Sequence, residues 1–242
     1  MRQNTAIILV LSTEMLLCLP TVAQNVVDSG TITGPSGGTT TYNGITTDSH
    51  GTVTHTGTIT GPGGKISTVD GQASYQNGAV RDSGTVTGPS GNTSTFSGQT
   101  TLNNGAVDHT GAITGPGGKQ VEVNRVTTDV DGTIDHTATY IGPKGKTETV
   151  NSQGRFQNGA WRNSGSIKGP AGRVSTFNGT STFRNGRFNH SGTVTGPAGT
   201  HARIASSGSA GKGTWTGSTS VTGQGGKTRT YRGTGTVRRA AR

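Results

Sequence analysis

Large apolar residues recur along this chain at fixed positions within a unit of 27 residues, separated by polar and small residues. Most copies carry an apolar residue at positions 9, 15, 20 and 26 of the unit, as in Val69, Tyr75, Val80 and Val86. This alternation predicts half-buried β-strands rather than helices. Numbered from a glycine that precedes proline in the first seven copies, the repeats begin at residues 34, 61, 88, 115, 142, 169, 196 and 223.

Two turn signals divide each repeat. The sequence Gly-Pro-x-Gly opens seven copies, as at Gly88–Gly91, where proline fixes φ of the first turn residue and the closing glycine can adopt a left-handed conformation. Asn-Gly pairs such as Asn77-Gly78 lie halfway along the repeat and are typical of a two-residue hairpin turn. Each repeat is therefore predicted to contain two antiparallel strands of about ten residues.

The two turns can be tested against the apolar pattern. A two-residue turn at Asn77-Gly78 pairs Tyr75 with Val80, so that the apolar positions share one face. The Gly-Pro loop keeps them on that face and places Gly84 opposite Phe96. We therefore predict an all-β fold, a continuous antiparallel β-meander of about 16 strands from eight hairpin repeats, which forms one domain over residues 24–242. The opposite face carries mostly Thr, Ser, Asn and Gln.

The hairpin unit resembles the short glycine-rich hairpin repeats called membrane occupation and recognition nexus repeats. The resemblance rests on the Asn-Gly turn, as at Asn104-Gly105, and on regularly spaced glycines and aromatic residues. The 27-residue length departs from that family, and the resemblance implies nothing about function.

The apolar face of so wide a sheet must be covered. We expect a rolled or flattened sheet in two layers, because a closed soluble barrel would enclose a void that its inward side chains could not fill. The alternatives are a β-solenoid and a 16-stranded β-barrel. A membrane barrel fits less well, because polar residues such as His55 and Asp82 occupy the middle of the apolar face, where lipid would demand apolar ones.

The repeats that begin at residues 34, 115 and 196 deviate together from the other copies. At position 15 they carry Asp48, Asp129 and Ala210, where the other full repeats have a large apolar residue. This three-repeat superperiod predicts either bends in the sheet or an ancestral triplication.

The N-terminal segment 1–23 has the pattern of a signal peptide. Arg2 precedes an apolar stretch, and Thr21-Val22-Ala23 provides small residues at a cleavage site. Cleavage would remove Cys18, the only cysteine, so that disulfides could not stabilise the mature chain. We predict a secreted or extracytoplasmic protein, placed in the periplasm, at the cell surface or outside the cell, with no transmembrane helix in the mature chain.

Composition argues against catalysis. Only 26% of residues are hydrophobic and 13% are charged, too few for a helical bundle or most α/β enzyme folds. No nucleophile, base and acid stand out as a set, so we expect no enzyme activity and no cofactor. Histidines at position 22, such as His109 and His136, recur two strands (~9–10 Å) apart, too far to share one metal ion. Their protonation below about pH 6 is expected to loosen the sheet.

Charge is divided unevenly between the two halves of the chain. Residues 24–148 contain six Lys or Arg against ten Asp or Glu, whereas residues 149–242 contain fourteen against none. Arg155 and Arg162 should lie directly opposite on the polar face, where a bound anion would relieve their repulsion. The candidate anion-binding residues are Arg155, Arg162, Arg203, Lys212, Lys227, Arg229, Arg232, Arg238, Arg239 and Arg242.

These features suggest an exported structural or adhesive β-repeat protein of the cell envelope or extracellular matrix. One alternative is a binding module for anionic envelope polysaccharide that uses the basic C-terminal half. The other is an outer-membrane β-barrel channel. The expected partners are an anionic polysaccharide or envelope polymer and further copies of the chain joined through sheet edges, and no nucleic acid is expected.

Overall fold

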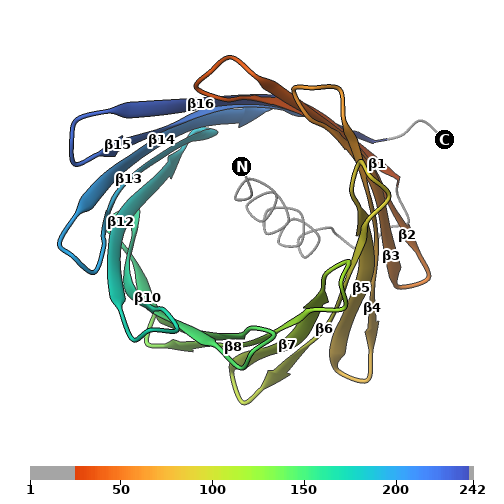
Figure 1. The fold of residues 1–242 in the computed structure, drawn as a ribbon, viewed down its shortest axis with the longest axis horizontal. Coiled ribbons are helices and arrows are strands. Elements are labelled where there is room, and N and C mark those ends of the chain that lie inside the picture. The colour runs from red at the N-terminus through yellow and green to blue at the C-terminus, as the bar shows by residue number, and fades with distance from the viewer. Residues whose placement is uncertain (1–24, 240–242) are drawn as a thin grey trace.

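The structure is a computed structural model that describes residues 25–239, whose sixteen strands form one closed antiparallel barrel (Figure 1). The predicted signal peptide at 1–23 lies outside the described residues. Each strand pairs with its neighbours in sequence, and β1 pairs with β16. The strands are β1 (Val26–Thr33), β2 (Thr39–Ser49), β3 (Thr52–Thr60), β4 (Ile66–Gln76), β5 (Ala79–Thr87), β6 (Thr93–Asn103), β7 (Ala106–Thr114), β8 (Gln120–Val130), β9 (Thr133–Ile141), β10 (Thr147–Gln157), β11 (Ala160–Lys168), β12 (Val174–Arg184), β13 (Arg187–Thr195), β14 (His201–Gly211), β15 (Thr214–Gly223) and β16 (Thr228–Arg239).

The predicted meander of hairpin repeats is confirmed. Tyr75 faces Val80 and Gly84 faces Phe96, as the turn chemistry required. The β-solenoid is excluded, because neighbouring strands are antiparallel all round the sheet. The sheet closes as the sixteen-stranded barrel that we considered as an alternative, and it does not flatten into two layers.

The two kinds of turn lie at opposite rims of the barrel. At the Asn-Gly rim both turn residues have positive φ, for example 51° at Asn77 and 75° at Gly78, as a two-residue turn between twisted strands requires. At the Gly-Pro rim, the Gly88 amide donates to the Asn92 carbonyl at 2.8 Å, and the Gly91 amide donates to the Gly88 carbonyl at 2.9 Å. Gly91 has a φ of 78°, which completes the predicted glycine bulge.

The pairing of β1 with β16, here called the seam, differs from the hairpins within repeats. In the hairpins, repeat position 16 faces position 19, as Ser49 faces Thr52. At the seam, position 16 is Arg238 and faces Val27 at position 21, so that the register is offset by two residues. Both ends of the described chain lie at the Asn-Gly rim, where an eighth turn would otherwise join them.

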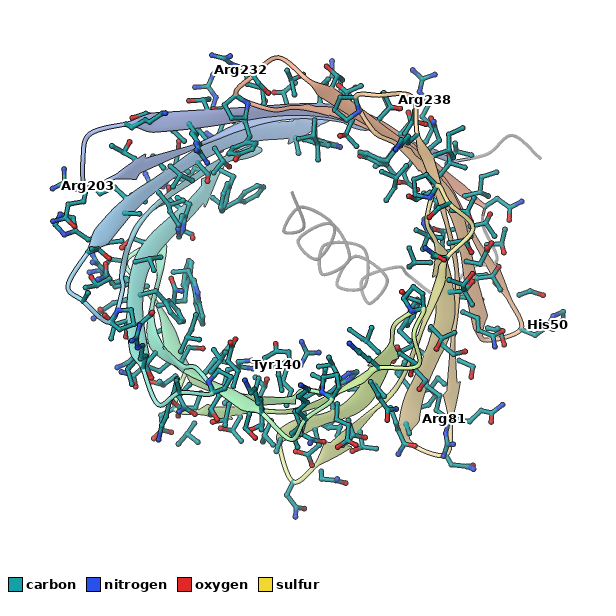
Figure 2. The ribbon with its side chains drawn as sticks, viewed as in Figure 1. His50, Arg81, Tyr140, Arg203, Arg232 and Arg238 are labelled. Atoms are coloured by element: carbon teal, nitrogen blue, oxygen red, sulfur yellow. The ribbon has the colours of Figure 1, made fainter. Side chains whose placement is uncertain are left out.

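The side chains show which face of the sheet lines the barrel. In Figure 2 Tyr140 points into the barrel, whereas Arg81, Arg203 and Arg232 point away from it. Directly paired residues share a face and neighbouring residues alternate, so the whole face of Tyr140 lines the lumen. That face carries repeat positions 9, 15, 20, 22 and 26, which means that the apolar rows point inward and the Thr- and Ser-rich face points outward.

Exposure along the strands agrees with this assignment. On β4, Thr68 and Asp70 of the outer face are exposed, whereas Val69 and Gly71 of the inner face are half-buried. The convex side of a curved sheet spreads its side chains apart, and the concave side crowds them together. Within residues 25–239, no helix has the length and apolar character needed to cross a bilayer.

The inner aromatic rings lie along the barrel wall against glycines. A Cβ at Gly84 would stand 2.4 Å from Cζ of Phe96, and one at Gly154 would stand 2.0 Å from Cζ2 of Trp161. Our expectation of a flattened sheet assumed that inward side chains must meet across the interior. The rings instead pack on the backbone of neighbouring strands, so that closure does not require the centre to be filled.

Candidate anion-binding wall and lumen

Seven adjacent strands present a basic surface on the outside of the barrel. Strands β10 to β16 carry eight outward Lys or Arg side chains, all of them exposed, and no outward Asp or Glu among the described residues. The outward acids lie on β4 to β9, at Asp70, Asp108, Glu122 and Asp135. The eight residues, here called the basic wall, are Arg155, Arg162, Lys168, Arg184, Arg187, Arg203, Arg232 and Arg238.

Like charges are paired directly across strands on the basic wall. Arg155 lies opposite Arg162 in the pairing of β10 with β11, as predicted, and Arg184 lies opposite Arg187 in that of β12 with β13. Directly opposite like charges repel and destabilise a sheet. An anion bound between two guanidinium groups would remove this repulsion, since each offers a planar fork of donors.

Two depressions open to solvent on the basic wall. The first has a volume of about 790 Å³ and is lined by Arg155, Arg162 and Arg203, together with amide and hydroxyl side chains such as Asn178 and Ser164. The second has a volume of about 620 Å³ and contains Arg187 and Arg232 among further Ser, Thr and Asn residues. Guanidinium, amide and hydroxyl groups together can bind a carboxylated or sulfated sugar, whose ring hydroxyls need partners beside its charge.

The structure separates the ten predicted anion-binding residues into several places. Lys212 lies in a turn at the Asn-Gly rim, with a φ of 51°, and Lys227 lies in a loop at the Gly-Pro rim. Arg229 pairs with Val221 and therefore faces the lumen, away from the other predicted residues. Arg239 pairs with Val26 at the seam, and Arg242 lies outside the described residues. The basic wall contains the remaining five, Arg155, Arg162, Arg203, Arg232 and Arg238.

The sequence-based list missed three members of the basic wall. Lys168, Arg184 and Arg187 occupy repeat positions 27, 16 and 19, which belong to the outer face by strand alternation. Applying that alternation to every basic residue of the C-terminal half would have found them. The same procedure would have removed Arg229 from the list.

A second basic surface lies at the Gly-Pro rim. Its loops carry six exposed Lys or Arg side chains and no acidic residue. These residues, here called the basic rim, come from loops on both sides of the barrel and are not confined to the C-terminal half. They are Lys65, Lys119, Lys144, Lys146, Arg173 and Lys227.

A polar belt crosses the middle of the lumen wall. His55, His109, His136 and His190 each share a hydrogen bond of 2.9 Å through Nδ1 with a Thr or Ser hydroxyl on the paired strand. Among the described residues, no three His, Cys, Asp or Glu side chains gather as a metal site would require. The hydrogen bonds make these histidines partners of hydroxyl groups along the wall.

Two inward groups of the lumen have altered acidity. Burial lowers the pKa of His109, as does the neighbouring Arg125, while Asp82 opposes the shift. Burial raises the pKa of Tyr42, whose hydroxyl accepts a hydrogen bond of 3.3 Å from Nε1 of Trp215. In both groups the largest cause of the shift is partial burial in the inner wall.

The inner wall ends at the Asn-Gly rim in a ring formed by repeat position 15. Four of its members are large apolar side chains that are two-thirds exposed: Tyr75 (67%), Leu102 (69%), Phe156 (66%) and Phe183 (67%). Asp48 and Asp129 occupy the same position in the deviating repeats. This ring, here called the Asn-Gly mouth, therefore combines exposed apolar side chains with carboxylates.

The barrel is similar in fold to porins of solved structure. A mutant of Rh. blastica porin has a TM-score of 0.67 at 8% identity, covering 90% of this chain and 99% of that chain. A triple mutant of Rhodopseudomonas blastica porin has a TM-score of 0.66 at 9% identity with the same coverage. Identities this low show a shared fold alone. No protein-family model and no curated protein match the chain.

Proposed function

We propose that this protein is an exported, non-catalytic barrel that binds acidic polysaccharide along its basic wall. The observation that carries the proposal is the set of eight outward Lys and Arg side chains on β10 to β16, with no outward acid between them. Side-chain charge of one sign on one surface attracts a polymer of the opposite sign. The predicted export of the chain favours an envelope or matrix polysaccharide over nucleic acid.

The extent of the basic wall favours a polymer over a small anion. Seven strands spaced ~4.8 Å apart span roughly 30 Å around the barrel, the length of several sugar residues. The two depressions lie on this surface and contain five of its eight basic residues. A chain with one charge per sugar could thus occupy both depressions and neutralise the Arg155–Arg162 and Arg184–Arg187 pairs.

The outer face favours a role in water over one in lipid. Membrane barrels carry an apolar outward band about 25 Å tall. Here the middle of the strands carries outward polar pairs, such as Gln72 with Ser83 and Gln153 with Ser164. Closure also pairs β1 with β16, so that both end strands of the meander have partners. A structural or adhesive role would therefore act through the side chains of the wall.

The proposal is tested by measuring binding of the purified protein to polygalacturonate, with neutral dextran as the control polymer. We expect affinity for polygalacturonate that falls steeply with added salt, and none for dextran. The combined substitutions Arg155→Gln, Arg162→Gln, Arg203→Gln and Arg232→Gln should weaken binding at least tenfold. The matched control is Arg81→Gln, which removes an exposed outward arginine outside the basic wall. Equal binding of polygalacturonate by the wild type and by the variant with these four substitutions would refute the proposal.

The fold similarity to porins favours a second candidate, an outer-membrane channel. In that role the basic rim would encircle one entrance and favour passage of anions. The two candidates differ in a simple measurement. Stepwise anion-selective conductance after addition to a planar bilayer would support the channel, whereas a monomer that stays dissolved without detergent and produces no conductance would support the binding module.

A further inference from the structure

We infer that the lumen is a binding site for one cationic amphipathic helix of another molecule, which enters through the Asn-Gly mouth. This site uses the inner face of the barrel and is independent of polysaccharide binding on the outer wall. Three features of the inner face point to such a guest: the sign of its charge, its exposed apolar rows, and the absence of free backbone partners in a closed sheet.

The charge of the inner face is opposite to that of the whole protein. The sequence carries a formal net charge of +10, yet the charged side chains that point inward within residues 26–238 are five acids and two bases. The two inward bases within this range are Arg125 and Arg229. A cationic guest is therefore attracted by the lumen and repelled by the outer wall. The inward acids are Asp28, Asp48, Asp82, Asp129 and Glu148.

The apolar rows of the lumen would favour a guest with an apolar face. Tyr75, Leu102, Phe156 and Phe183 are two-thirds exposed at the Asn-Gly mouth, which leaves apolar surface for a partner to cover. Burial of such surface stabilises a complex. Asp48 and Asp129 stand in the same ring, so the mouth offers both kinds of contact to a helix with one apolar and one cationic face.

Closure of the sheet selects a helix over an extended peptide. Every strand has a partner on both sides, so that a peptide inside finds no free backbone donors or acceptors to form another strand. A guest that satisfies its own backbone groups, as a helix does, needs neither strand partners nor water for them in the lumen. Sixteen tilted strands have a backbone diameter of roughly 30 Å, which leaves a bore of roughly 15–20 Å within the side chains, and one helix is about 10–12 Å across.

The chain contains its own reporter for this site. Its two tryptophans, Trp161 and Trp215, both face the lumen, through pairing with Phe156 and Ala210. The probe is a synthetic 18-residue Lys/Leu helix without tryptophan. We expect saturable one-to-one binding with a shift of tryptophan emission. A Glu/Leu helix of the same pattern and a Lys/Leu peptide of scrambled order should produce no shift.

The site is then located with matched variants. Asp48→Asn with Asp129→Asn should weaken binding of the Lys/Leu helix at least fivefold, because both changes keep shape and remove charge. The amide introduced by Asp129→Asn keeps an oxygen that can accept the 3.1 Å hydrogen bond from the Gly132 amide. The control pair Asp70→Asn with Asp108→Asn removes outward acids and should leave affinity unchanged. Circular dichroism checks that each variant folds.

Phe156→Gln with Phe183→Gln provides a second test that leaves the inward charges intact, and it should also weaken binding. No emission shift with the Lys/Leu helix, or equal binding of the Glu/Leu helix, would overturn the inference. The variant with the four Arg→Gln substitutions on the basic wall separates the two proposals. This variant should lose binding to polygalacturonate and retain binding to the Lys/Leu helix. If one of these two expectations fails, the other proposal is still tested by its own measurement.

Discussion

At the scale of single residues, the fold depends on glycines that give room to inward aromatic rings. Gly84 and Gly165 face Phe96 and Phe177 across the strands and lie beneath their rings. The sequence predicted the pairing of Gly84 with Phe96 from register, but it did not show that the ring would lie against the backbone of the wall. That outcome depends on the curvature of the sheet, which no single repeat determines.

Gly84→Ala tests this packing. A Cβ at residue 84 would stand 2.3 Å from the Asp70 carbonyl oxygen and 2.4 Å from the Phe96 ring, so we expect a loss of about 1–3 kcal/mol in the free energy of unfolding. Urea unfolding measures it. The control is Gly63→Ala, at a loop position where a Cβ meets nothing within 4 Å. Equal stability of the two variants would contradict the packing described.

His109 predicts how stability depends on pH. Its pKa is lowered in the folded barrel, so the unfolded chain takes up a proton near pH 6.5 that the folded protein binds less well. The stability that the neutral imidazole provides is complete above about pH 6.5 and decreases as the pH falls toward the folded pKa.

Urea unfolding at pH 7.5 and 5.5 checks this. His109→Gln should lose less stability between pH 7.5 and pH 5.5 than the wild type does. Arg125→Gln should also reduce this loss of stability, because removing the cation raises the pKa of His109. His201→Gln, at an exposed outward position, is the control and should behave as wild type. An unchanged pH dependence in His109→Gln would rule out this role.

At the scale of elements, the two turn types are what made the strands predictable. Proline fixes φ, whereas glycine and asparagine accept the positive φ that tight turns need, so the spacing of these residues set strand lengths and register before any tertiary contact was known. The positive φ at Asn104 and Gly105 confirms the hairpin that their sequence predicted. At the same rim His50 has a φ of 52°, although histidine is less suited than asparagine to this conformation.

His50→Asn should therefore stabilise the barrel by about 0.5–1 kcal/mol, because the asparagine of other repeats adopts the left-handed conformation with less strain. Thermal unfolding measures the change. Ser49→Asn, one residue earlier and within β2, places the same side chain in an extended strand and should provide no gain. If both variants gained equally, the effect would not come from the turn.

At the scale of the whole molecule, the inner and outer faces could not be assigned from sequence. Local patterns show which residues share a face, but the direction of curvature comes from the twist accumulated over sixteen strands. The candidate site was predictable to the same degree. Arg155 and Arg162 were placed correctly by register. Strand alternation also separates Arg229 from their face, but only the structure shows that this other face lines the lumen.

The two-residue offset at the seam has a consequence for the size of the barrel. The stagger between strands, together with their number, determines strand tilt and hence the radius of a closed sheet. The seven hairpins at the Asn-Gly rim share one register. The pairing of β1 with β16, in which Arg238 lies opposite Val27, departs from it. A slip of two residues at this one junction would thus change the diameter of the barrel without changing any repeat. The pairing of the first strand with the last can therefore adjust the width of the barrel while the hairpins stay the same.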